Sequence, residues 1–368
     1  MNYIRCKRCV MDNKADNFIT FNEDGICNYC TEALSKKNKI YFPNEEGQKR
    51  LDNMIEKLKC DNKHKKYDCL MGISGGLDSS YLAYLGAAKW GLRILAVHID
   101  DGYDTEISKS NIKKLCEKTK IDMVTIKPDS EQFNDLTRAY VLARVPNLAV
   151  PQDNILFATI YNFAKEYNIK TFLSGGNFAL ESILQRGNTI NAYDLANLKD
   201  IHSKFGSKPI SKLPLISDLQ LDINRWLLNL KTFRPLNYLD YNREKALKEL
   251  YDYCGFEYYG SKHLENVLTK FIQTYWLPNK YGVDKRTSHY SSMIISDQMS
   301  RDEALKLLEK PVYDESIYDE IDMILCNINL TKEKFDEIMK MPPKQHTDYK
   351  TSNYVKIRRQ ISKIFKNK

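Results

Sequence analysis

A glycine-rich turn between an apolar segment and a helical one constrains the fold of this chain more than any other feature. Residues 67–73 have the character of a buried strand, residues 74–79 read Ser-Gly-Gly-Leu-Asp-Ser, and residues 80–88 continue as a helix. Two adjacent glycines let consecutive N–H groups face one anion, and the helix adds the positive end of its dipole. The turn is therefore predicted to bind phosphate; the alternative is a tight connection of small residues without a ligand.

The turn offers hydroxyl donors and a metal ligand. Ser74, Ser79 and Ser80 can donate to phosphate oxygens, and Asp78 can hold the Mg²⁺ that bridges them. The turn lacks the Gly-Lys-Ser/Thr ending of a Walker loop and the Gly-x-Gly-x-x-Gly of dinucleotide sites. The nucleotide contacts predicted here are Ser74, Gly75, Gly76, Leu77, Asp78, Ser79 and Ser80.

Strand-like and helix-like segments alternate after the turn. The pattern places strands at residues 92–99, 123–126 and 170–173, and helices at residues 105–118 and 155–167. This alternation predicts an α/β fold with a doubly wound parallel sheet, whose ligands bind at the carboxyl ends of the strands.

A second glycine pair follows the strand predicted at residues 170–173. On a parallel sheet it lies beside the first turn, so the backbone of Gly175 and Gly176 can approach the nucleotide. Asn177 is predicted to read an amide or a base edge, and Glu181 to share the Mg²⁺ with Asp78. The alternative is a turn with a purely structural role.

Two Cys-x-x-Cys pairs lie within the first thirty residues. A short strand at residues 18–21 and a turn at residues 22–25 are predicted between them, as in a zinc ribbon. A closed site of four thiolates leaves no coordination position for a substrate, which disfavours catalytic or redox cysteines. An iron–sulfur cluster stays compatible with this ligand set. The predicted zinc ligands are Cys6, Cys9, Cys27 and Cys30.

The length of 368 residues allows two or three domains. We expect a four-cysteine zinc-ribbon module with its linker at residues 1–45, the nucleotide-binding domain at residues 46–230, and a mainly helical region at residues 231–368 that completes the acceptor site. No apolar stretch is long enough to span a membrane and the first residues lack a signal core, so we expect a cytoplasmic protein. A net charge of +8 suits phosphorylated ligands and does not demand nucleic acid.

One stretch of the helical region has a chemical character. Lys285 and Arg286 are adjacent and follow Asp284, so they can clamp pyrophosphate or charge that develops at a reacting centre. The alternative is a solvated pair of surface cations, and the basic run at residues 350–368 is expected to be a solvated end.

The Ser-Gly-Gly-Leu-Asp-Ser turn resembles that of the ATP pyrophosphatases, or PP-loop enzymes, among them asparagine synthetase, GMP synthetase and several tRNA-modifying enzymes. The resemblance implies that the turn grips the departing pyrophosphate while AMP is transferred to an acceptor oxygen. It also implies that His98 and Asp100, at the end of the second predicted strand, contact the nucleotide. A structural histidine is the alternative for His98.

Further motifs resemble those of the N-acetyl sugar amidotransferases, which serve surface-polysaccharide and flagellin-glycan pathways. The resemblance covers residues 4–341, nearly the whole chain. It includes the Cys-x-x-Cys-Val-Met-Asp start, the phosphate turn, Asn-Tyr-Leu-Asp-Tyr-Asn at residues 237–242, Gly-Ser-Lys-His-Leu-Glu at residues 260–265 and Tyr-Gly-Val-Asp-Lys-Arg-Thr-Ser-His at residues 281–289.

The implied reaction converts an acetamido group of a free or nucleotide-linked N-acetyl sugar, such as a pseudaminic-type sugar, into an acetamidino group. ATP adenylates the amide oxygen, and ammonia then displaces AMP; Mg²⁺ and the cations Lys262, Lys285 and Arg286 neutralise the charge that leaves. Because residue 2 is Asn2 and four cysteines are assigned to metal, ammonia is expected from a separate glutaminase subunit, accompanied by a cyclase-like subunit.

Two other classes of protein fit part of the pattern. A tRNA-thiolating enzyme also combines a PP-loop with Cys-x-x-Cys zinc pairs, but it needs a basic face and often a persulfide-carrying cysteine. A non-catalytic nucleotide-binding protein of the same fold has no need of the aspartate and serines of the turn.

Overall fold

The computed structural model describes residues 3–14, 16–260 and 264–354, which are built around one parallel sheet. Its strands run in the order β3-β2-β1-β4-β5, and every neighbouring pair is parallel. The chain fills one half of the sheet from β1 to β3 and returns to the other side of β1 for β4 and β5, so a topological switch point lies between β1 and β4. The strands are β1 (Cys69–Gly72), β2 (Ile94–Ile99), β3 (Asp122–Ile126), β4 (Thr171–Leu173) and β5 (Lys231–Phe233).

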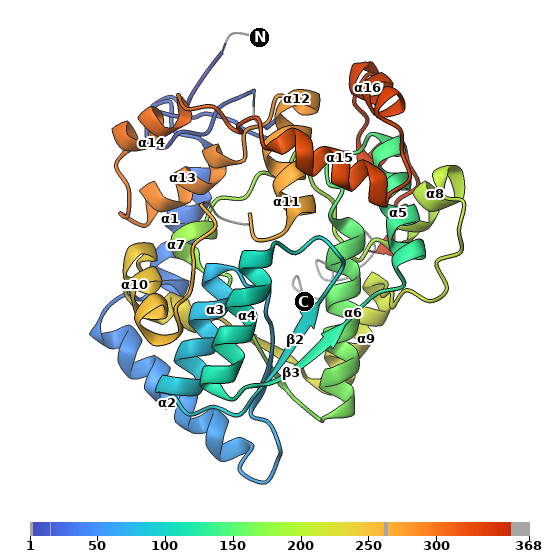
Figure 1. Cartoon of the computed structure of the whole chain (residues 1–368). Helices are drawn as coiled ribbons and strands as arrows, with labels where there is room; N and C mark the ends of the chain where they lie inside the picture. The colour runs from blue at the N-terminus through green and yellow to red at the C-terminus, as the bar shows by residue number, and fades with distance from the viewer. Residues whose placement is uncertain (1–2, 15, 261–263, 355–368) are drawn as a thin grey trace, which may run out of the picture.

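Helices cover both faces of this sheet (Figure 1). Successive side chains of a strand point to opposite faces, so Cys69 and Met71 pack in one core with α3 and α4, and Leu70 packs in another with Ile160 of α6. The helices of the sheet half are α1 (Asn28–Ile40), α2 (Glu45–Asp61), α3 (Leu77–Tyr84), α4 (Glu106–Thr119), α5 (Ser130–Ala143), α6 (Val150–Glu166), α7 (Phe178–Glu181), α8 (Leu195–Phe205) and α9 (Asp218–Leu228).

The C-terminal helices form a second core. Trp276 is fully buried at its centre beside Phe271 and Phe335, and its indole N–H donates to the carbonyl of Val145 at 3.0 Å. Apolar burial on this scale holds the helical region against the sheet half. The elements are α10 (Arg243–Cys254), α11 (Val267–Phe271), α12 (Leu277–Tyr281), α13 (Arg286–Ile295), α14 (Arg301–Leu308), α15 (Ile317–Asn327) and α16 (Lys332–Lys340), with π turns at Leu85–Lys89 and Ile272–Trp276 and 3₁₀ turns at Pro235–Tyr238 and His346–Asp348.

The predicted doubly wound sheet and the helical C-terminal region are confirmed, with two local differences. The predicted strand at residues 18–21 is wrong, because only Phe21 makes an isolated bridge, with Cys27. β5 was not predicted, because Lys-Thr-Phe at residues 231–233, of which the first two are exposed, lacks the apolar character of a buried strand. No helix of the described residues is long and apolar enough to cross a bilayer.

A buried histidine anchors the end of the described chain. Asn197 donates its amide hydrogens to the carbonyls of His346 (2.9 Å) and Lys350 (3.1 Å), so its oxygen must accept from Nδ1 of His346 at 3.0 Å. Nε2 of His346 is buried and has no partner among the described residues. Burial lowers the pKa of His346 to about 4 because a proton on Nε2 would find no acceptor.

Acid is therefore expected to destabilise the fold through His346. Between pH 6.5 and pH 4 the unfolded chain binds a proton at this side chain and the folded chain does not, so the free energy of unfolding falls as pH decreases, by about 2 kcal/mol. Denaturant unfolding at pH 7 and pH 4.5 measures the change. In His346→Gln the pH dependence over this window should shrink; an unchanged slope would contradict the assignment.

Candidate active site

The phosphate turn occupies the switch point of the sheet. Gly75 has φ of +75°, and a Cβ there would lie 2.6 Å from the backbone oxygen of Ser108, so conformation and space both require glycine. The turn after β4 approaches it closely, since a Cβ on Gly175 would lie 3.1 Å from the backbone of Asp78. The structure thus brings the two glycine pairs together, as the sequence pattern predicts.

The N–H and hydroxyl donors of the turn form hydrogen bonds with oxygen atoms of the protein. The backbone N–H of Leu77 donates to the hydroxyl of Tyr259 at 2.8 Å, and the hydroxyls of Ser74 and Ser79 lie 3.3 Å apart. Ser74 also donates to Oε1 of Glu265 at 3.1 Å. An anion that binds the turn would exchange with these partners, because phosphate oxygens are stronger acceptors than a phenol.

Two other residues of the turn have different surroundings. Asp78 is the second residue of α3, and its Oδ1 accepts a short hydrogen bond from the buried hydroxyl of Tyr241. Ser80 is fully buried, and its hydroxyl has no hydrogen-bond partner among the described residues. The predicted phosphate contact by the Ser80 side chain is therefore not supported, because the residue lies in the core under the turn.

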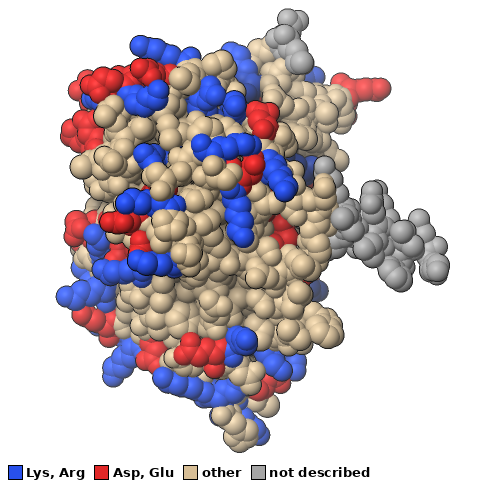
Figure 2. All heavy atoms as spheres, turned by 90° about the vertical axis from the view of Figure 1, so that its right-hand side faces the viewer, with Lys and Arg blue, Asp and Glu red and all other residues tan. Residues whose placement is uncertain are grey.

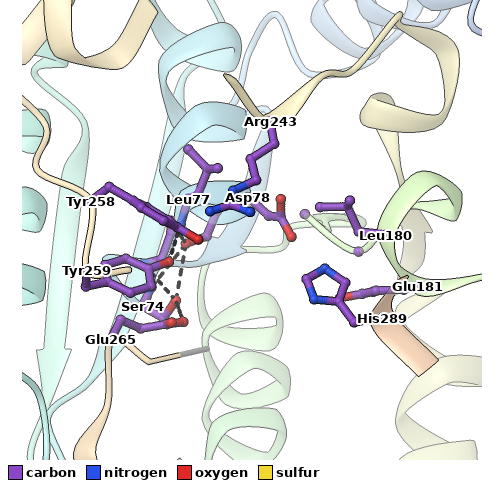
Figure 3. A pocket seen from close by; sticks show the side chains of 14 residues that line it. Ser74, Leu77, Asp78, Leu180, Glu181, Arg243, Tyr258, Tyr259, Glu265 and His289 are labelled. Atoms are coloured by element: carbon purple, nitrogen blue, oxygen red, sulfur yellow. Dashed lines mark hydrogen bonds between the residues drawn. The ribbon is translucent and has the colours of Figure 1, made fainter. Parts of the chain in front are cut away.

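A cavity of about 180 Å³ opens beside the turn (Figure 3). Asp78 and Arg243 meet on one side, and Glu181 of α7 lies across the cavity next to His289 of α13. Opposite charges gathered around a phosphate-binding turn suit a metal-bound polyphosphate, whose oxygens need both cations and a metal held by carboxylates. The lining residues are Ser74, Gly76, Leu77, Asp78, Ser79, Gly175, Gly176, Leu180, Glu181, Arg243, Tyr258, Tyr259, Glu265 and His289.

Arg243 and Glu265 are the residues that sequence reasoning missed. Arg243 begins α10, and its guanidinium stacks 4.7 Å from the ring centre of Tyr258. Glu265 is 7% exposed, and its Oε2 is buried without a partner among the described residues, so the carboxylate has unused acceptor capacity. In the sequence, Glu265 is marked only as the last residue of the motif at residues 260–265, and no motif includes Arg243.

A second cavity of about 310 Å³ continues from the turn along the ends of β1, β2 and β4, where an adenosine would lie. His98 lines it, but Nδ1 donates to the carbonyl of Ile73 at 2.9 Å, and Nε2 lies 3.0 Å from a carboxylate oxygen of Asp104, with which the protonated ring forms an ion pair. Burial opposes the charged ring, and the hydrogen bond and charge of Asp104 outweigh this and raise the pKa of His98. With both nitrogens engaged, the predicted nucleotide contact is limited to the carbon edge and face of the ring.

Two predicted nucleotide contacts have other roles in the structure. Asp100 pairs with Lys127 at 2.9 Å, which lowers the pKa of its carboxyl, and it does not line either of these cavities. Asn177 caps α7: its oxygen accepts from the N–H of Leu180 at 3.0 Å and its amide donates to the carbonyl of Gly175 at 3.1 Å. An amide used for capping is not free to read a base edge.

The predicted cationic clamp does not reach the phosphate turn. Arg286 makes a bidentate ion pair with Asp284 at 2.8–3.1 Å and also donates to the carbonyl of Pro311, which follows α14, at 3.3 Å. Lys285 and Arg286 both line an adjoining cavity instead of the one that contains Asp78. Lys262, the third predicted cation, lies outside the described residues.

The four N-terminal cysteines form one buried cluster whose sulfur atoms all lie within 4.8 Å of one another. The distances are 3.9 Å between the sulfurs of Cys6 and Cys30 and 3.7 Å between those of Cys9 and Cys27. A zinc tetrahedron with bonds of about 2.3 Å has sulfur–sulfur edges of about 3.8 Å, so the cluster fits this ion. All four positions are filled by protein sulfur, as in a structural site.

The cysteine cluster packs against the helices that border the cavity. Arg301 of α14 donates to the carbonyls of Cys6 and Cys9, each at 3.1 Å, and Ser291 of α13 accepts from the N–H of Val10 at 3.2 Å. A metal in the cluster would therefore fix the position of α13, which carries His289.

Removal of one sulfur ligand tests the assignment. Cys27→Ser should lose the bound zinc, which we expect at about one ion per chain, and should lower the melting temperature because metal binding contributes to folding. Elemental analysis and thermal unfolding measure both effects. Cys60→Ser, at an exposed site on α2, is the matched control. Iron in the wild-type protein would contradict zinc, and retained zinc in Cys27→Ser would remove that ligand.

Comparisons with known proteins match two segments of the chain. Residues 48–177 match the NAD synthase family, and residues 265–362 match the C-terminal domain of WbpG-like lipopolysaccharide (LPS) biosynthesis proteins. The uncharacterized protein MJ1599 of Methanocaldococcus jannaschii is 20% identical over 320 residues, which cover 86% of this chain and 98% of the relative.

Solved structures with similar chains include NMN synthetase from Francisella tularensis, at 18% identity and a TM-score of 0.31 over 79% of this chain and 95% of that one. The U34-tRNA thiolase NcsA from Methanococcus maripaludis, solved with its [4Fe-4S] cluster, has 14% identity and a TM-score of 0.32 over 84% and 89%. The NAD synthase match indicates an ATP-using enzyme of the C–N ligase type. The two matches, an NAD synthase segment followed by a WbpG-like C-terminal segment, are consistent with the PP-loop ATP pyrophosphatase superfamily.

Proposed function

We propose that this protein adenylates the acetamido oxygen of an N-acetyl sugar and replaces it with ammonia nitrogen, releasing AMP and pyrophosphate. The observation that carries the proposal is the cavity beside the phosphate turn, where Arg243 meets Asp78 of the turn. The WbpG-like match supports a sugar of surface-polysaccharide biosynthesis as the substrate class. A PP-loop alone would not favour a sugar over any other acceptor.

The residues of the first cavity divide the work of adenylation. The N–H groups of the turn and the Ser74 hydroxyl would bind the pyrophosphate half of ATP, and Arg243 would take up negative charge as the α–β bond breaks. Asp78 and Glu181 are the carboxylates that would hold Mg²⁺, which neutralises charge on the triphosphate. Glu265 is a further candidate ligand because its Oε2 has no partner among the described residues.

Adenylation makes the unreactive amide carbon of the acceptor susceptible to attack by ammonia. An amide carbon is a poor electrophile because its nitrogen delocalises into the carbonyl. With AMP on the oxygen the carbon becomes imidate-like, ammonia adds to it, and AMP leaves with the former amide oxygen. The product is an amidine, and exclusion of water from the cavity would protect the activated carbon from hydrolysis.

We propose that the ammonia comes from a separate glutaminase subunit, accompanied by a cyclase-like subunit. A glutaminase needs an accessible, activated cysteine. Cys69 is buried in β1, which raises the pKa of its thiol, and burial raises the pKa of Cys116 to about 11. None of the five cysteines outside the metal cluster lines the cavities described here. A cytoplasmic location is part of the same proposal, because ATP and nucleotide-linked sugars are found there.

The charge distribution on the face in Figure 2 can be compared with the basic surface that a tRNA-thiolating enzyme needs. Basic and acidic side chains are interspersed on this face, whereas nucleic-acid binding uses a surface on which basic residues gather. This face therefore offers no basic surface of the kind that a tRNA would need.

Mass spectrometry tests the reaction. The protein is incubated with ATP, Mg²⁺, ammonium and a panel of free and nucleotide-linked N-acetyl sugars, and the expected product is lighter than its substrate by the difference between oxygen and NH. Asp78→Ala should lower pyrophosphate release at least about 100-fold, because a carboxylate that holds the metal is lost. Asp336→Ala, at an exposed position of α16, is the control. An Asp78→Ala protein with wild-type turnover would refute the metal role.

A further inference from the structure

A larger cavity of about 500 Å³ adjoins the cavity beside the phosphate turn. The two share Leu180, Glu181 and His289, and Figure 3 shows the last two directly across from Asp78. The walls of the larger cavity come from α7, the π turn at Ile272–Trp276, the start of α13 and the segment that follows α14. A molecule bound there can place one group at the shared wall, where it faces the phosphate turn.

Lys285 stands out among the residues of this larger cavity. Its ammonium group has no hydrogen-bond or ion-pair partner among the described residues, although burial lowers its pKa. Asp16 is the acid whose charge acts on it, but that carboxylate is buried and already accepts from Tyr29, from the N–H of Phe18 and from the N–H of Arg186. Among the described residues, Lys285 therefore has no carboxylate in direct contact, and the nearest charge that acts on it is already bound by other donors.

The other cations of the cavity differ from Lys285. Arg286 is neutralised by Asp284, and Lys310 lies at an exposed position of the rim. The hydroxyl hydrogen of Ser288 is donated to the carbonyl of Lys285 at 3.0 Å, so its oxygen remains as an acceptor for a ligand hydroxyl. Lys285 is half-buried, so its ammonium is partly removed from water, and an anionic ligand that reaches it would offset the lost hydration.

We propose that the larger cavity is the acceptor site, that its occupant carries an anionic group, and that Lys285 is the counter-ion of that group. The assignment rests on the proposed function, which requires an acceptor next to the phosphate turn. The anion is a carboxylate of a sugar acid or a diphosphate of a nucleotide-linked sugar. The acetamido group of the bound sugar would lie at the wall that the two cavities share, between Glu181 and Asp78.

Binding measurements test this without turnover. The probes are N-acetylneuraminate, which carries a carboxylate, UDP-N-acetylglucosamine, which carries a diphosphate, and neutral N-acetylglucosamine. Titration calorimetry measures their Kd for the full chain, and a non-hydrolysable ATP analogue is titrated into each variant. We expect an anionic probe to bind at least about tenfold more tightly than the neutral one, and the tighter of the two anionic probes identifies the source of the charge.

Variants isolate the role of the charge. Lys285→Met keeps the length of the side chain and should weaken the anionic probe at least about 30-fold, while Lys285→Arg should restore most of the affinity. Lys310→Met, at the exposed rim of the same cavity, should change Kd less than about threefold because solvent screens this charge. The affinity for the ATP analogue should stay the same in all three.

The outcomes separate this inference from the proposed function. If no anionic probe binds the wild-type chain, if Lys285→Met leaves its Kd unchanged, or if the neutral probe binds equally tightly, the assignment of the cavity is overturned. If an anionic probe binds through Lys285 but no amidine forms from any sugar, the proposed function fails and the anion site stands. An undiminished yield of amidine in Lys285→Met would sustain the function and overturn this inference.

Discussion

The backbone N–H groups where β1 passes into α3 are the constraint on which the rest of the site depends. They converge because Gly75 adopts a positive φ and Gly76 caps the helix without a side chain, and the close approach of Ser108 leaves no room for a Cβ on Gly75. Converging N–H groups at the start of a helix attract an anion. Their position at the switch point of the sheet places that anion where β1, β4 and the C-terminal region meet.

The C-terminal region completes this anion site. Three residues that follow β5 form hydrogen bonds with the turn in this structure. Tyr241 donates to Asp78, Tyr259 accepts from the N–H of Leu77, and Glu265 accepts from Ser74. These contacts satisfy polar groups that would otherwise be buried without partners. A phosphate that enters must replace the hydroxyl of Tyr259 at the N–H of Leu77. The C-terminal region would therefore respond to nucleotide binding, and it also forms most of the adjoining cavity.

The sequence predicts the features that depend on neighbouring residues. The phosphate turn, the parallel sheet and the cysteine cluster all follow from spacings of a few residues, and the structure places each of them as expected. Arg243 and Glu265 could not be found in this way, because they reach Asp78 and Ser74 only through the packing of α10 and the segment before α11. The role of His98 also depends on tertiary packing, since Nδ1 donates to the carbonyl of Ile73 and Nε2 lies against the carboxylate of Asp104. Arg286 was assigned to phosphate because its pairing with Asp284 depends on a local turn geometry that the sequence does not reveal.

The products of ATP cleavage reveal which phosphate bond breaks at the turn. A turn that grips the β and γ phosphates of ATP lets the bond between the α and β positions break, whereas a kinase-like site transfers the terminal phosphate. With ATP labelled at the α-phosphate and a competent acceptor, we expect the label to appear in AMP, in step with pyrophosphate. Label in ADP, with orthophosphate or a phosphorylated acceptor, would contradict it.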